Sequence, residues 1–293
     1  MVSGEWVCAG GAGEEDEVKE VKDVKEVSKE ELMRVLVTFA VEAEFAPWRK
    51  RWPFEIAAAG GIRFWRADID DCNVTVLLTA MGTLAAVLTV DTFLRKENED
   101  KSFAVCISSG LAGALRETLG PGDIIAPRML VPETVYPERQ ENRLEVNAAL
   151  RELALKCGAK GTDCLWTADQ VLVKAADKKI YSSRAEAVDM ESFGIATEAG
   201  AWGLRTVVVR AISDSVVEDL PLDFNRTLSD NEQISVSKVL IQLAKRPSAI
   251  PAMVKFGLQS RRAAESLATF LDKYLRELSK VSALSGSNEM ATR

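Results

Sequence analysis

Short apolar runs that alternate with helix-like segments are the feature that most constrains the fold of this chain. Runs rich in Val, Ile and Leu predict buried strands, and the segments between them are typical of helices that end at glycine or proline. Strands are expected at residues 33–40, 62–67, 74–80, 103–108, 123–131, 164–167, 185–190 and 204–212. Helices are expected at residues 42–52, 82–96, 142–157, 191–202, 231–245 and 252–280, and a loop at 110–113. This alternation predicts a three-layer α/β domain with a largely covered sheet.

The first 31 residues differ from the rest in charge. Residues 14–31 carry nine acidic residues and four lysines, with valines as the only apolar side chains. Such a segment buries too little apolar surface to offset the entropy of ordering it, so we expect a disordered acidic tail. We expect the main domain at residues 32–245, a C-terminal helical extension at 246–280 and a flexible tail at 281–293.

The 293 residues include no histidine. This excludes Ser-His-Asp triads, Cys-His dyads and histidine metal centres, and it leaves carboxylates, Lys, Tyr, Ser, Thr and Cys for any chemistry. The five cysteines form no C-x-x-C pair, which favours buried thiols in a reducing cytoplasm. The net charge of −7 argues against a nucleic-acid partner. We expect neither a transmembrane helix nor a signal peptide.

Acidic residues and glycines gather where four predicted strands end. These clusters lie at residues 40–44, 107–115, 188–192 and 211–214. Open α/β sheets bind ligands at such strand ends. Each cluster also has a simpler explanation, as first-turn helix acids, a helix cap or glycines of a tight turn. Their joint occurrence in one histidine-free domain favours a functional site.

These clusters resemble motifs of the nucleoside phosphorylase/nucleosidase superfamily, most closely those of the 5′-methylthioadenosine/S-adenosylhomocysteine nucleosidases. Residues 207–214 read VVVRAISD, which matches a strand end of that branch, and the other clusters follow its order and spacing over about residues 33–245. The resemblance implies a central mixed sheet flanked by helices, here with an extra C-terminal helix. It also implies a nucleoside substrate, no metal or redox cofactor, and a homodimer or higher homo-oligomer.

The resemblance also implies roles for individual residues. Glu44 corresponds to the carboxylate that activates the attacking water, and Asp214 corresponds to the acid that serves the purine N7. Glu191 corresponds to the carboxylate that binds the ribose hydroxyls. The other implied substrate-binding residues are Asp189, Met190, Leu111, Ala112, Gly113, Val171, Leu172, Ser213 and Phe224.

Three carboxylates suffice for cleavage of an N-glycosidic bond. The reaction passes through an oxocarbenium-like sugar, as in glycoside hydrolysis. One acid protonates the leaving purine, a second carboxylate activates water, and a third holds vicinal hydroxyls. The expected function is therefore a purine nucleoside N-glycosidase that acts on adenosine or a 5′-substituted adenosine.

Departures from the family pattern leave alternatives open. Leu111 replaces the loop serine, Asp189 replaces the glutamate before Met190, and Val171 replaces the ring that stacks on adenine. These changes leave the identity of the base and of the 5′ substituent undetermined. They also keep a non-catalytic nucleoside-binding protein as an alternative function.

The acceptor is a second open choice. Phosphorylases of the superfamily carry an arginine where this chain has Ser108, and they use a Gly- and Arg-containing loop where it has Glu42 and Glu44. Because a carboxylate repels a phosphate dianion, hydrolysis is favoured over phosphorolysis. Arg210 is the cation that would most readily overturn this prediction.

The C-terminal extension carries eight basic and four acidic residues between 246 and 293, with apolar residues at helical spacing. We expect a helix docked on the domain or on a second subunit. The alternative is a basic amphipathic helix near a membrane, which would suit a lipid-linked adenosine.

Overall fold

The computed structural model describes residues 32–98, 103–133, 143–226, 241–242 and 245–290, with side chains as far as Lys280. The acidic tail expected at residues 1–31 and most of the helix expected at 231–245 lie outside these ranges.

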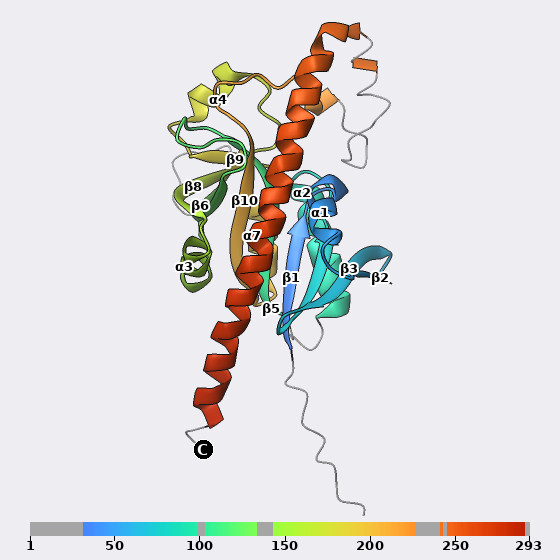
Figure 1. The fold of residues 1–293 in the computed structure, drawn as a ribbon, viewed down its shortest axis with the longest axis vertical. Coiled ribbons are helices and arrows are strands. Elements are labelled where there is room, and N and C mark those ends of the chain that lie inside the picture. Colours follow the sequence, from blue (N-terminus) through green and yellow to red (C-terminus); the bar gives the residue numbers. More distant parts are fainter. Residues whose placement is uncertain (1–31, 99–102, 134–142, 227–240, 243–244, 291–293) are drawn as a thin grey trace, which may run out of the picture. The chain divides into compact units, whose positions relative to one another are not determined.

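Ten strands form one mixed sheet (Figure 1). They are β1 (Met33–Phe39), β2 (Glu55–Ala59), β3 (Ile62–Ile69), β4 (Cys72–Leu78), β5 (Phe103–Ala114), β6 (Ile124–Pro132), β7 (Leu144–Glu145), β8 (Lys160–Thr167), β9 (Ala187–Asp189) and β10 (Arg205–Asp214). β5 pairs in parallel with β1 and β10 and antiparallel with β9. Because β6 joins β10 to β8, and β8 joins β9, the strands β5, β9, β8, β6 and β10 close into a ring. β1, β4, β3 and β2 extend from that ring.

Helices cover both faces of the sheet. α2 (Thr83–Glu97) and α5 (Ser192–Ala201) pack together on one face, while α1 (Glu42–Arg49), α3 (Ala148–Lys156) and α7 (Ile250–Met290) share a core with the other. β1 shows the alternation that produces these two cores, because Val35 and Val37 face α1 and α7 whereas Leu36 faces α2 and α5. The expected three-layer α/β fold with a mixed sheet is confirmed.

The C-terminal helix α7 docks on the domain, as the favoured reading of the sequence predicted. Apolar residues between 263 and 278 are buried in the core that α1 and α3 share. The Tyr274 hydroxyl donates to the Leu150 carbonyl at 3.0 Å. The indole N–H groups of Trp48 and Trp52 both donate to Asp272 Oδ1, at 2.7 and 2.8 Å.

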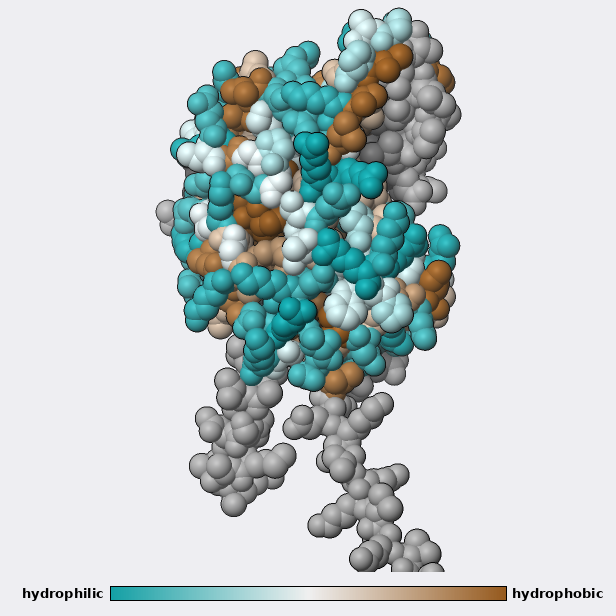
Figure 2. Space-filling model, viewed as in Figure 1, coloured by the Kyte–Doolittle hydropathy of each residue, from teal (hydrophilic) through white to brown (hydrophobic). Residues whose placement is uncertain are grey.

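The first part of α7 differs from the prediction. Val254 and Leu258, which the apolar spacing places with the buried residues, are 58% and 53% exposed. Figure 2 shows apolar surface near the start of this helix. The helix continues to Met290, beyond the end expected at residue 280. Within the described ranges, no helix is long and apolar enough to cross a membrane.

Three local predictions need correction. The loop expected at 110–113 is part of β5, because its backbone continues to pair with β10 from Gly110 to Gly113. The helix expected from residue 142 begins at Ala148, where the Asn147 side chain caps it by accepting from Leu150 N at 3.1 Å. β2 and α4 (Ala175–Tyr181) were not expected, since an alanine-rich strand and a seven-residue helix carry weak patterns.

Candidate active site

A cavity of about 880 Å³ opens at the end of the sheet where β1, β5, β9 and β10 finish. All twelve residues that the sequence assigned to the site line it. They are Glu44, Leu111, Ala112, Gly113, Val171, Leu172, Asp189, Met190, Glu191, Ser213, Asp214 and Phe224. The strand-end clusters of the sequence therefore lie around one cavity.

Glu44 is held by backbone N–H groups. Its Oε2 accepts from Ala40 N at 2.9 Å and Val41 N at 3.4 Å, and its Oε1 accepts from Leu111 N at 2.9 Å. We call these three donors the N–H cradle. Burial raises the pKa of Glu44, while Arg210 and the N–H cradle act in the other direction. A carboxylate that is both fixed and more basic than usual is suited to accept a proton from water.

Gly110 and Gly113 allow β5 to pass close to two carboxylates. A Cβ at Gly110, where φ is +143°, would lie 2.6 Å from Arg210 Nη1 and 3.1 Å from Glu44 Oε2. A Cβ at Gly113 would lie 3.2 Å from Asp214 Oδ2. Gly110 and Gly113 are three residues apart, which is about 10 Å along a strand, so the two carboxylates approach β5 at two separate positions.

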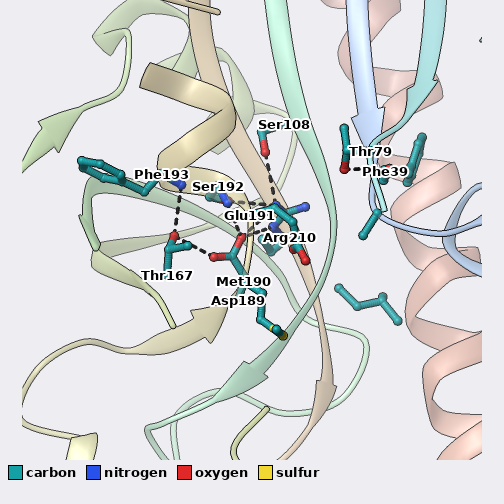
Figure 3. A network of polar contacts seen from close by, with 12 residues as sticks. Phe39, Thr79, Ser108, Thr167, Asp189, Met190, Glu191, Ser192, Phe193 and Arg210 are labelled. Atoms are coloured by element: carbon teal, nitrogen blue, oxygen red, sulfur yellow. Dashed lines mark hydrogen bonds and ion pairs between the residues drawn. The ribbon is translucent and has the colours of Figure 1, made fainter. Parts of the chain in front are cut away.

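Arg210 is a buried cation beside the cavity. Its Nε donates to Asp189 Oδ2 at 2.8 Å, and its Nη2 donates to Ser192 Oγ at 2.9 Å and Ser108 Oγ at 3.2 Å (Figure 3). Asp189 Oδ1 accepts from Thr167 Oγ1 at 2.9 Å. Protein groups thus occupy both oxygens of Asp189, which orients it toward Arg210 rather than toward a ligand. Ser108 stands where the phosphorylases have an arginine. In this chain Ser108 instead accepts a hydrogen bond from Arg210 of β10.

Glu191 follows β9 and accepts from Gly82 N at 2.8 Å. Its pKa is raised to about 8, first by burial and then by the negative charges of Asp189 and Glu44, against the pull of Arg210. Met190 precedes it, and the Met190 carbonyl accepts from Thr83 Oγ1 at 2.8 Å. These two bonds fix the β9 end against the start of α2.

Asp214 ends β10 within a polar cluster. Its Oδ1 accepts from Ser213 Oγ at 2.6 Å, and its Oδ2 forms an ion pair with Lys178 Nζ. Lys178 comes from α4, is 1% exposed and also lines the cavity. Sequence reasoning missed this lysine, because nothing in a seven-residue helix with three lysines nearby distinguishes the one that points inward.

An apolar cluster that includes residues of α7 lines a further part of the cavity. Phe224 packs on Phe256 of α7 with ring centroids 5.4 Å apart, and Met253 joins the same cluster. The Asn225 side chain holds the backbone of Val171. Its Oδ1 accepts from Val171 N at 2.8 Å, and its Nδ2 donates to Val171 O at 3.0 Å. Sequence reasoning also missed the contribution of α7, since helical spacing does not reveal which face meets a cavity.

Comparison with known proteins identifies a family and similar sequences. The family model described as the Phosphorylase superfamily matches residues 34–246. Two curated 5′-methylthioadenosine/S-adenosylhomocysteine nucleosidases are similar in sequence. That of Buchnera aphidicola is 26% identical over 180 residues, 55% of this chain and 74% of its own. That of Staphylococcus saprophyticus is 24% identical over 213 residues, 65% of this chain and 90% of its own.

Solved structures share the fold. A futalosine hydrolase of Helicobacter pylori matches with a TM-score of 0.63 at 20% identity, over 84% of this chain and 98% of its own. A 5′-methylthioadenosine/S-adenosylhomocysteine nucleosidase from Neisseria meningitidis, in complex with methylthio-immucillin-A, matches with a TM-score of 0.62 at 18% identity. That match covers 84% of this chain and 100% of the nucleosidase.

Proposed function

We propose, from the premise that the chain belongs to the phosphorylase superfamily, that it hydrolyses the N-glycosidic bond of adenosine or a 5′-substituted adenosine. The observation that carries this proposal is the position of Glu44. Its carboxylate fills the N–H cradle beside Arg210, where a phosphate would otherwise find its donors. An anionic acceptor would have to displace or face that carboxylate, whereas water can donate a proton to it.

The reaction then follows from the charges around the cavity. Glu44 takes a proton from water as its oxygen approaches C1′ of the sugar. Asp214 serves N7 of the purine, so that the base leaves as a neutral molecule. The carboxyl oxygens of Glu191 accept hydrogen bonds from the ribose hydroxyls, and Met190 packs against the sugar. Because Glu44 lies beside Gly110 and Asp214 lies beside Gly113, the two carboxylates are in place to act on the water and on the base respectively.

The substrate fits the apolar side of the cavity. Val171, Leu172 and Phe224 contribute apolar surface to its lining, which suits a flat purine. A volume of about 880 Å³ lies in the upper part of the range for small-molecule sites. This supports a 5′ substituent in addition to the nucleoside, and relatives named for 5′-methylthioadenosine or futalosine agree with that size.

Product analysis tests the proposal. A panel of adenosine, inosine, guanosine and 5′-alkylthio-adenosine is incubated with and without saturating phosphate. We expect free base and free sugar at a rate that phosphate does not change. Sugar-1-phosphate in strict dependence on phosphate would show a phosphorylase instead, and binding without base release would show a nucleoside-binding protein.

The proposal includes a homo-oligomer in the cytoplasm. Ile56 of β2 and Leu84 and Leu88 of α2 are 66%, 67% and 57% exposed, and the two elements contact each other. We expect a second copy of the chain to cover these side chains. The four described cysteines are free, which suits a reducing compartment. Light scattering should show a dimer or larger assembly that Leu84→Glu with Leu88→Glu dissociates and Leu258→Glu does not. A monomeric unmodified protein would contradict this part.

A further inference from the structure

Lys178 is a buried charge that the chemistry described above does not use. Its ammonium meets three acceptors, namely the Asp214 carboxylate and the carbonyl oxygens of Ser215 and Glu218, both at 3.0 Å. It is 1% exposed, and its partner Asp214 is 6% exposed. Burial of a charged pair costs several kcal/mol per ion unless good geometry offsets it. Lys178 is buried despite this cost, and its ion-pair partner Asp214 is the group proposed to act on the leaving base.

We propose that Lys178 is a positioning residue that acts through Asp214: it holds the carboxyl group at the base and supplies the proton that Asp214 passes to N7. This inference rests on the proposed hydrolysis. It answers a question that the carboxylate alone leaves open, because an ionised carboxylate has no proton to give. The pair of Asp214 and Lys178 holds one transferable proton between its two members.

The proton balance of this step closes. An N–H bond of the Lys178 ammonium breaks and an O–H bond to Asp214 forms. That O–H bond breaks as the N7–H bond of the purine forms, and the electron pair of the C1′–N9 bond stays with the base. Asp214 is a carboxylate before and after, Lys178 ends as a neutral amine, and Glu44 has gained the proton of the attacking water. Exchange with solvent returns one proton to Lys178 and removes one from Glu44.

The surroundings of Lys178 suit a proton that moves. Asp214 faces it from β10, and Ser215 and Glu218 face it from the segment that follows β10 with carbonyls only. Asp219 lies on the same segment, and the positive charge of Lys178 is one of the smaller causes that lower its pKa. The ion-pair partner of Asp219 is Lys174, at 2.9 Å. Asp177 and Lys179 on α4 itself are exposed to solvent. Among the described residues, Asp214 is thus the only carboxylate that Lys178 contacts directly.

Two substitutions separate proton supply from a structural role. Lys178→Met removes the ammonium, whereas Lys178→Arg keeps a positive charge that does not release its proton in proteins. Lys179→Met, next in sequence and exposed, is the matched control. Rates of adenine release are measured from pH 5 to pH 9 for each variant and divided by the unmodified rate, so that titration of Glu44 cancels. Circular dichroism and melting temperature report the fold.

We expect kcat at pH 8 to fall at least 100-fold in both Lys178 variants with KM within about threefold, because general acids contribute factors of 10² to 10⁴. For Lys178→Met the ratio to the unmodified rate should rise as pH falls, since the proton for N7 must then come from solvent. A ratio that is constant with pH, or a Lys178→Arg enzyme with near-normal kcat, would overturn the proposal. The arginine variant decides the question even where the methionine variant does not fold. An unmodified protein that releases no base refutes the proposed function itself, and this inference with it.

Discussion

Replacement of Glu191 with glutamine is expected to make the protein more stable, and increasingly so as pH rises. Burial and the nearby charges of Asp189 and Glu44 raise the pKa of Glu191 to about 8 in the folded chain, from an ordinary value of 4.5. A carboxyl with a raised pKa contributes its full stability below pH 4.5, where it is neutral in both states. That stability is lost as pH rises towards 8, because only the unfolded chain is then ionised.

The size of the effect follows from the two values. Each pH unit between 4.5 and 8 costs about 1.4 kcal/mol, so the free energy of unfolding falls by about 5 kcal/mol across this window. Glutamine stays neutral and its side-chain oxygen can keep the bond from Gly82 N. The difference between variant and unmodified protein should therefore grow from near zero at pH 4.5 to about 5 kcal/mol above pH 8.

Urea unfolding at pH 5, 6, 7, 8 and 9 measures this difference, because the other titrating groups are common to both proteins and cancel. Glu117→Gln, at an exposed carboxylate in the turn after β5, is the matched control and should give a difference that does not change with pH. Two outcomes would refute the charge arrangement described for the cavity. One is a difference between Glu191→Gln and the unmodified protein that is constant with pH, and the other is a variant that becomes less stable than the unmodified protein at high pH.

Three further predictions concern other parts of the chain. Glu44→Gln should lower kcat at least 100-fold with little change in KM, because the group acts on water and not on the nucleoside; a proportionate rise in KM would contradict this role. Gly110→Ala should lower the rate at least tenfold, since its Cβ would lie 2.6 Å from Arg210 Nη1, whereas Gly120→Ala meets no atom within 4 Å and should leave the rate unchanged. Removal of residues 1–31 should leave base release and melting temperature nearly unchanged, and a large fall in either would show that this segment docks.

The sequence predicted the carboxylates that line the cavity better than the other lining residues. Glu44, Glu191 and Asp214 follow strand ends, and strand ends can be located because buried strands are continuous apolar runs. The side chains that reach the cavity from elsewhere gave no such signal. Lys178 depends on how a short helix is rotated, and Phe256 depends on where α7 crosses the domain. Both are set by tertiary packing, which leaves no local pattern in the chain.

Gly110 and Gly113 are a second case in which the sequence pattern did not predict the local structure. Glycines after a strand suggested a loop, yet pairing with β10 continues the strand through them. Because these glycines have no side chain, the neighbouring carboxylates and Arg210 can approach the strand closely; the glycines do not form a turn. A sequence shows that a glycine is present, but only the fold shows what would collide with a Cβ there.

The docking of α7 adds side chains to the cavity that are separate from the carboxylates proposed to perform the reaction. Every carboxylate assigned to the reaction lies between residues 44 and 214, whereas Met253 and Phe256 reach the cavity from a helix anchored elsewhere through Asp272. Phe256 and Asp272 are 16 residues apart, which is about 24 Å along a helix. Substitutions in the first turns of α7 can therefore change substrate preference without disturbing the anchor or the carboxylates.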